Sequence, residues 1–163
     1  PDDVLHDAEN FGWDFQKYID KKMFSIEYQD PFEMVDITTL VKEKIEKFGA
    51  KRVVIDSTSI FGMVFKEENE LRKRLYELIK TLKQTDTAVL MTAEVLEDAK
   101  GLSRFGVEEF VADGVIILNY LGIGEVNTRT LQIRKMRRTD HGKDSYILDI
   151  TKDGLIVKKE SGI

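Results

Sequence analysis

Two short apolar runs separated by an amphipathic stretch constrain the fold of this chain most strongly. Residues 52–57 read R-V-V-I-D-S, and residues 88–92 read A-V-L-M-T. Apolar runs of this kind are typical of strands that are buried on both faces of a parallel sheet. Between them, apolar residues recur at helical spacing, at Leu71, Leu75, Leu78, Ile79 and Leu82. Strand, helix and strand at this spacing predict a βαβ unit and therefore an α/β fold.

The segments around this unit extend the same pattern. Residues 1–20 are expected to form two helical pieces that separate at Gly12, and residues 24–28 a short strand. A second apolar stripe over residues 37–48 predicts a helix, with Gly49 as its C-terminal cap. Residues 115–118 are interpreted as a further strand of the buried type.

The last third of the chain predicts antiparallel structure. Residues 131–136 alternate between apolar and polar side chains, as a half-exposed strand does. Asp153 and Gly154 separate the apolar stretches 146–151 and 155–157, and Asp-Gly favours a hairpin because it tolerates positive φ. We therefore expect a mostly parallel sheet flanked by helices, with a C-terminal antiparallel hairpin extension.

Composition excludes several classes of function. The 163 residues are enough for one domain, and the absence of cysteine excludes disulfides, thiolate zinc sites and cysteine nucleophiles. No apolar run is long enough to span a bilayer, and we expect a cytoplasmic protein. Lys and Arg number 25 against 30 Asp and Glu, and this net charge of −5 does not indicate a nucleic-acid binder.

Asp56 is the first candidate for chemistry, because it stands at the end of a predicted buried strand. Ligands of open α/β sheets gather at the carboxyl ends of strands, and an apolar run ending in Asp is the Walker B pattern that orients Mg²⁺ on a nucleotide. An Asp that caps the following turn explains the same residue equally well. Thr92 and Glu94 end the next strand and are expected beside Asp56 if the two strands are neighbours.

The stretch from Arg129 to Lys143 is the strongest local charge feature. It holds six Lys and Arg residues against Asp140, so its net charge is 6 − 1 = +5 in an acidic chain. Lys135 and Arg137 are two residues apart and would reach one anion, such as a phosphate, from one face of a strand. A solvated edge hairpin and a nucleic-acid surface remain equally good explanations of the same charges.

One motif is absent from the sequence. A nucleotide hydrolase of this architecture wraps phosphates in the backbone N–H groups of a G-x-x-x-x-G-K-[ST] loop, the Walker A loop. The 163 residues contain no such loop. The residues present would therefore form an incomplete ATP site by themselves.

Four segments together resemble the KaiC-like branch of the RecA-type ATPases. Residues 11–14 resemble the FGWD segment of that family, and residues 52–57 resemble its Walker B strand. Residues 104–113, R-F-G-V-E-E-F-V-A-D, resemble its R-x-G-V-E-E-F-V-x-D signature. Residues 135–141, K-M-R-R-T-D-H, resemble its K-M-R-G-T-x-H signature. The similarity covers essentially the whole chain, and the last two segments are specific.

The resemblance implies a P-loop RecA-like domain that assembles into a homo-oligomeric ring, usually a hexamer, with ATP and Mg²⁺ between neighbouring subunits. It implies that Asp56 is the Mg²⁺-associated carboxylate. Lys135 and Arg137 would be the catalytic cations, which reach the phosphates of the neighbouring subunit and act like an arginine finger. The further nucleotide contacts that it implies are Asn10, Met136, Thr139, His141 and Thr151.

Two departures from the family pattern shape the functional expectation. Arg138 stands where the family has glycine, and the Walker A loop and the paired glutamates of the family lie upstream of the FGWD segment. We therefore expect residues 1–163 to be the C-terminal two-thirds of a single KaiC-like domain, with ATPase activity only if the N-terminal segment is present. The alternative is a non-catalytic oligomerisation or protein-interaction module. Nucleic acid is not the partner expected for an acidic chain.

Overall fold

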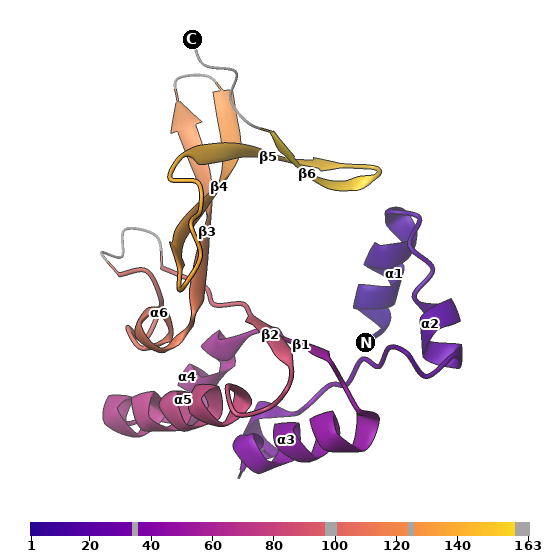
Figure 1. The fold of residues 1–163 in the computed structure, drawn as a ribbon, viewed down its shortest axis with the longest axis vertical. Helices are drawn as coiled ribbons and strands as arrows, with labels where there is room; N and C mark the ends of the chain where they lie inside the picture. The colour runs from indigo at the N-terminus through magenta and orange to yellow at the C-terminus, as the bar shows by residue number, and fades with distance from the viewer. Residues whose placement is uncertain (34–35, 97–100, 124–125, 159–163) are drawn as a thin grey trace. The chain divides into compact units, whose positions relative to one another are not determined.

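The computed structural model describes residues 1–33, 36–96, 101–123 and 126–158 (Figure 1). The chain divides into two compact units, one formed by Gln29–Asp113 and the other by Pro1–Tyr28 together with Gly114–Ile163. Helices and strands are both present, which confirms the predicted α/β class. In the part of the chain that the structure describes, no helix is both long and apolar enough to cross a membrane.

The unit Gln29–Asp113 contains two parallel strands and several helices. Its strands are β1 (Arg52–Ile55) and β2 (Ala88–Met91), which pair in parallel with Val53 opposite Val89 and Val54 opposite Leu90. Its helical segments are η1 (Pro31–Glu33), α3 (Ile37–Phe48), η2 (Thr58–Ile60), α4 (Phe61–Val64), α5 (Glu68–Leu82) and α6 (Glu108–Val111). The order β1–α5–β2 confirms the predicted βαβ unit.

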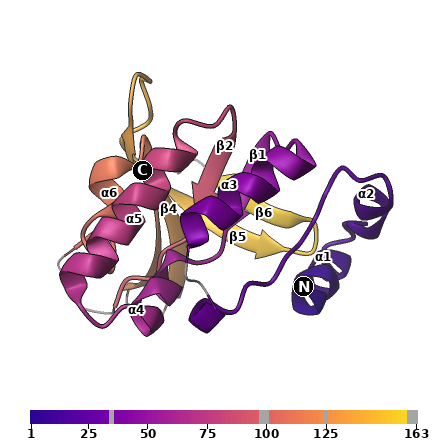
Figure 2. The ribbon, with the colours of Figure 1, turned by 90° about the horizontal axis from the view of Figure 1, so that it is seen from below.

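The core of this unit lies between the helices and one face of the strand pair. Figures 1 and 2 draw α3 and α5 on the same side of β1 and β2. The buried cluster consists of Ile45, Phe61, Leu71, Leu75, Leu78 and Leu82, and the inward-facing strand residues Val53, Ile55, Val89 and Met91 pack against it. Val54 and Leu90 alternate with these residues and are 66% and 54% exposed. The prediction that both strand faces are buried is therefore wrong for the described residues.

The ends of α3 follow the local sequence. Asp36 is the N-cap, and its carboxylate accepts hydrogen bonds from the Thr39 backbone N–H at 3.1 Å and from the Thr39 hydroxyl at 2.6 Å. Gly49 ends the helix with a φ of 69°, a left-handed conformation that glycine adopts without a steric penalty. This confirms the predicted C-terminal cap.

The second unit contains α1 (Asp2–Asn10) and α2 (Gln16–Asp20), which confirms two helical pieces separated at Gly12. Its four strands form an antiparallel sheet in the order β3-β4-β5-β6. They are β3 (Gly114–Ile123), β4 (Val126–Met136), β5 (Ser145–Thr151) and β6 (Gly154–Lys158). The predicted hairpin over residues 146–157 is the β5–β6 pair, and Gly154 in its turn has a φ of 109°.

One strand prediction in this unit is wrong, and another is right about the strand but wrong about its burial. Residues 115–118 lie in β3, where they pair antiparallel with β4, and Ile116 and Leu118 are 51% and 64% exposed. Their run of apolar side chains had the composition of a buried parallel strand, but the hairpin to β4 determines their pairing. Residues 24–28 form no strand; they belong to the connection after α2, in which Phe24 packs on Phe15 with ring centroids 4.8 Å apart.

Candidate functional site

Asp56 directly follows β1, and the neighbouring strand supplies its partner. The Thr92 hydroxyl donates a hydrogen bond to Oδ1 of Asp56, and Asp56 itself is exposed. The backbone of Thr92 also forms hydrogen bonds on either side of Asp56. The Thr92 N–H donates to the Ile55 carbonyl at 3.0 Å, and the Thr92 carbonyl accepts from the Thr58 N–H at 2.9 Å. The expected meeting of Asp56 and Thr92 at the carboxyl ends of two neighbouring strands is therefore found.

Glu94 lies near this strand end through its backbone. Its N–H donates to the Ser59 hydroxyl at 2.9 Å. Its carboxylate lies 3.9 Å from the guanidinium of Arg104, and the side chain is 74% exposed. Glu94 thus pairs with the first residue of the 104–113 signature segment, while Thr92 is the residue that contacts Asp56.

Thr58, two residues after Asp56, forms a buried polar contact with Glu108 that the sequence reasoning missed. Thr58 is fully buried, and its hydroxyl lies 3.2 Å from the Thr92 carbonyl and 3.3 Å from Oε1 of Glu108. Glu108 is only 8% exposed. Glutamate is rarely buried without a partner, and here Thr58 is that partner. The available signal was a hydroxyl residue two positions after a strand-end Asp, followed by the apolar residues Ile60 and Phe61.

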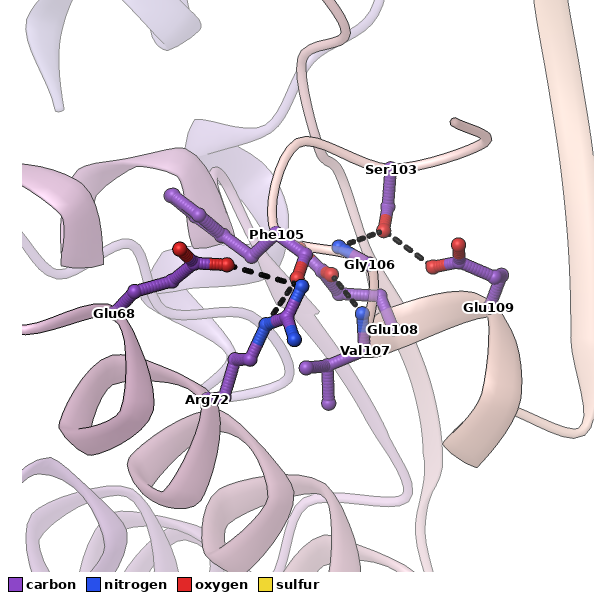
Figure 3. Close-up of polar contacts among 8 residues, drawn as sticks. All are labelled: Glu68, Arg72, Ser103, Phe105, Gly106, Val107, Glu108 and Glu109. Carbon is purple, nitrogen blue, oxygen red and sulfur yellow. Dashed lines mark hydrogen bonds and ion pairs between the residues drawn. The ribbon is translucent and has the colours of Figure 1, made fainter. Parts of the chain in front are cut away.

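The loop before α6 is fixed by a set of short contacts (Figure 3). The Ser103 hydroxyl accepts from the Gly106 N–H at 3.1 Å and donates to the carboxylate of Glu109. Arg72 on α5 donates to the Phe105 carbonyl at 3.0 Å and pairs with Glu68 at 3.0 Å. The loop at residues 103–107 is therefore an anchored turn. It places Glu108, the first residue of α6, in contact with Thr58.

The donors around Asp56 fit a magnesium ion that arrives with a nucleotide. Among the described residues, no group of three or more His, Cys, Asp or Glu side chains could hold a metal ion. Mg²⁺ is commonly bound by one or two carboxylates together with substrate phosphates and waters, rather than by a cage made only of protein groups. Asp56 as a carboxylate with the hydroxyl of Thr92 beside it matches this pattern.

The basic signature lies at the end of β4 and in the turn that follows. Lys135 and Met136 are the last two residues of the strand, and Arg137 already belongs to the turn. The argument that Lys135 and Arg137 lie two apart on one strand is therefore wrong, although both residues remain at the same end of the sheet. The Thr139 hydroxyl donates to the Arg137 carbonyl at 3.4 Å, and Nδ1 of His141 lies 2.9 Å from the Gly142 carbonyl.

Asn10 and Thr151 lie in other parts of the same unit. Asn10 is the last residue of α1, and Trp13 of the following FGWD segment stacks on Phe11 with ring centroids 5.0 Å apart. The Thr151 hydroxyl accepts from the Asp153 N–H at 3.2 Å and donates to the Gly154 carbonyl at 3.0 Å. A Cβ built on Gly154 would lie 2.9 Å from the Trp13 ring, so the FGWD segment packs closely on the β5–β6 turn.

The structure thus places the predicted site residues in three groups. Asp56, with Thr92, lies at the carboxyl ends of β1 and β2 in the unit Gln29–Asp113. The segment 135–141 lies at the end of β4, and Asn10 and Thr151 lie near the contact between Trp13 and Gly154. The β4–β5 register pairs Gln132 with Ser145, so β5 runs away from the Lys135 end towards Thr151.

Comparison with known proteins identifies the family. A family model described as "ATPase: KaiC" matches residues 1–162. The circadian clock oscillator protein KaiC of Synechococcus elongatus is 35% identical over 165 residues, covering 95% of this chain and 32% of that protein. The KaiC of Acaryochloris marina is 36% identical with the same coverage. The chain therefore spans about a third of the length of these curated relatives.

A solved structure gives the same result for the fold. The crystal structure of a KaiC-like protein from the hyperthermophilic archaeon Pyrococcus horikoshii OT3 matches with a TM-score of 0.85 and 31% identity, covering 96% of this chain and 70% of that chain. The α/β fold is thus that of a RecA-type ATPase. Within that class, the chain belongs to the KaiC ATPase family.

Proposed function

We propose that this chain contributes part of an Mg-ATP site in a KaiC-type ATPase, with the nucleotide bound between neighbouring subunits. The observation that supports it most directly is the contact between Asp56 and Thr92 at the carboxyl ends of β1 and β2. This is the edge of an α/β sheet at which ligands bind. The match of residues 1–162 to the family model supports the nucleotide as that ligand.

In this proposal Asp56 holds the magnesium ion of the nucleotide. The ion would neutralise charge on the phosphates, and the residues of this chain would orient it. The Thr92 hydroxyl fixes one carboxylate oxygen of Asp56 and leaves the remaining lone pairs for the ion or its waters. The exposure of Asp56 is consistent with an approach by the nucleotide from solvent.

Lys135 and Arg137 are proposed to act on the nucleotide held by the neighbouring subunit. A cation placed there neutralises the charge that develops as the terminal phosphoryl group leaves. The end of β4 and its turn concentrate the positive charge of an otherwise acidic chain, which supports this role. Met136, Thr139 and His141 in the same segment, together with Asn10 and Thr151, are proposed nucleotide contacts.

We further propose that the 163 residues are the C-terminal two-thirds of one KaiC-like domain. Two observations support this: the chain covers 70% of the P. horikoshii protein, and its sequence contains no Walker A loop. The assembly would be a homo-oligomeric ring, most simply a hexamer, in the cytoplasm. Hydrolysis would require the Walker A loop from the remaining part of the domain.

The test compares Mg-ATP affinity in matched variants. The chain is joined behind a Walker A segment from a KaiC relative, and Lys135→Ala and Arg137→Ala are compared with Arg129→Ala. Each variant loses one cation from the same basic stretch, but Arg129 lies six residues from Lys135 along β4, roughly 20 Å away. Loss of a charge-assisted hydrogen bond costs about 1.5–3 kcal/mol, so we expect affinity to fall about tenfold or more for the first two variants.

Two outcomes would contradict the proposal. An equal, small loss for all three variants would show that only the overall charge of the stretch matters. Absence of Mg-ATP binding with intact folding and assembly would instead favour the non-catalytic interaction module. A nucleic-acid role would appear as binding of DNA or RNA whose affinity falls steeply with salt concentration.

A further inference from the structure

Glu108 is a buried carboxylate to which the proposed function assigns no role. Its Oε1 lies 3.3 Å from the Thr58 hydroxyl, and its Oε2 accepts from the Val107 N–H at 3.3 Å. A hydroxyl has a single proton to donate, and a carboxylate is a stronger acceptor than a backbone carbonyl. Glu108 therefore fixes the orientation of the Thr58 side chain.

Thr58 in turn fixes the residue that holds Asp56. The Thr58 N–H donates to the Thr92 carbonyl at 2.9 Å, and the Thr92 N–H donates to the Ile55 carbonyl at 3.0 Å. These two bonds hold the backbone of Thr92 beside the two-residue segment formed by Asp56 and Ser57. With its backbone fixed in this way, Thr92 directs its hydroxyl at the Asp56 carboxylate.

Glu108 is itself held by an anchored loop (Figure 3). The bond from Arg72 to the Phe105 carbonyl ties the loop to α5, and the Ser103 hydroxyl closes it onto the Gly106 N–H. Gly106 has a φ of 65°, so the chain turns sharply just before α6. Thr58 and Glu108 are 50 residues apart in sequence, and this turn brings them together.

We propose that Glu108 is a positioning residue, which orients the Asp56 carboxylate through Thr58 and Thr92 and so sets how strongly the site requires Mg²⁺. This inference rests on the proposed function, since it gives Asp56 the magnesium-associated role. Under this inference, Glu108 in the 104–113 segment orients the Asp56 carboxylate in addition to stabilising a turn.

Four variants separate positioning from packing. Thr58→Val keeps the volume of the buried side chain and removes the hydroxyl, whereas Thr58→Ser keeps the hydroxyl and loses a methyl group. Glu108→Ala removes the carboxylate, and Glu108→Gln keeps an oxygen acceptor. Glu77→Ala is the control, because it removes a carboxylate of α5 that pairs with Lys73 and Arg74.

The first readout needs no nucleotide: the ¹³C resonance of the Asp56 carboxyl carbon in the 163-residue chain. We expect it to move in Thr58→Val and Glu108→Ala, and to stay near its wild-type position in Thr58→Ser, Glu108→Gln and Glu77→Ala. The effects of Thr58→Val and Glu108→Ala should be non-additive, because both break the same contact. The second readout uses the chain joined behind the Walker A segment and is the Mg²⁺ concentration that gives the half-maximal response of this resonance with ATP present.

Removal of residues that orient a metal ligand typically weakens metal binding 10–100-fold, so the Mg²⁺ requirement should rise on the order of tenfold in Thr58→Val and Glu108→Ala. If the wild-type response to ATP does not depend on Mg²⁺, the role of Asp56 fails and the inference falls with it. If the wild type responds to Mg²⁺ but Glu108→Ala behaves like Glu77→Ala, the inference alone is overturned. The same holds if Thr58→Ser is as impaired as Thr58→Val.

Discussion

At residue 138 the backbone adopts a left-handed conformation, with a φ of 60°, on an arginine. The KaiC-like signature has glycine at this position, and glycine adopts such a φ without a steric penalty. Arg138 therefore holds a conformation that glycine would adopt with less backbone strain.

This strain gives a prediction for stability. A left-handed conformation costs a non-glycine residue about 1–2 kcal/mol, and the greater freedom of glycine in the unfolded chain offsets part of the gain. We expect Arg138→Gly to raise the free energy of unfolding by about 0.5–1 kcal/mol, measured by urea denaturation. Arg137→Gly is the control and should destabilise the protein or leave it unchanged. A loss of stability in Arg138→Gly would contradict the account.

Single residues differ in how far the sequence reveals their role. Gly49 and Gly154 were predictable, because turns that need a positive φ leave a local signature. Asp56 was placed at a strand end by the same local reasoning. The contact between Thr58 and Glu108 was not predictable, because it depends on how a loop 50 residues further along the chain folds.

The N-terminal cap of α3 makes the stability of this helix depend on pH. The Thr39 hydroxyl and then the Thr39 backbone N–H lower the pKa of Asp36, because both bonds favour the ionised carboxylate. A lowered pKa in the folded state means that the cap stabilises the fold above roughly pH 4, the unfolded value, and that this contribution is lost as the pH falls through the folded pKa.

We therefore expect Asp36→Asn to have a flatter pH dependence than the wild type. Asparagine retains an oxygen that can cap the helix but does not titrate. The measurement is the thermal midpoint of both proteins between about pH 6 and pH 3, with amide exchange at Thr39 as a local probe. The wild type should lose more stability below roughly pH 4 than the variant. Parallel curves would show that the ionisation of Asp36 does not contribute to the pH dependence.

In the unit Gln29–Asp113, the core lies between the helices and one face of the strand pair, and the other face of β1 is exposed. Leu78 on α5 is fully buried, whereas Val54 on β1 is 66% exposed. We expect Leu78→Ala to cost about 3 kcal/mol of unfolding free energy, because it leaves a cavity, and Val54→Ala to cost less than about 0.5 kcal/mol. Urea denaturation of both variants checks the difference, and equal costs would mean that Val54 is also buried in solution.

Elements were predictable where a local period determined them. Helices α3 and α5 and the β5–β6 hairpin follow from apolar spacing and from the Gly and Asp residues at their ends. The apolar composition of β1 and β2 did not reveal that the described strand pair is covered on one face. Nor did the composition of residues 115–118 reveal their antiparallel pairing, because the partner strand determines it.

At the scale of the molecule, motif order revealed more than any single motif. Four segments in the family's order predicted the family. The match of the family model to residues 1–162 confirmed it. The site residues lie in three groups distributed over both units, and proximity along the sequence cannot show how such groups combine. In the proposed ring, these groups would complete nucleotide sites together with neighbouring subunits.

The most direct test of the central claim is native mass spectrometry, with and without Mg-ATP, of the chain joined behind the Walker A segment. The account predicts a closed homo-oligomer, most simply a hexamer, that carries about one nucleotide per subunit and loses nucleotide in Asp56→Asn. A monomer without nucleotide under both conditions would contradict it. An oligomer without nucleotide would instead support the non-catalytic interaction module.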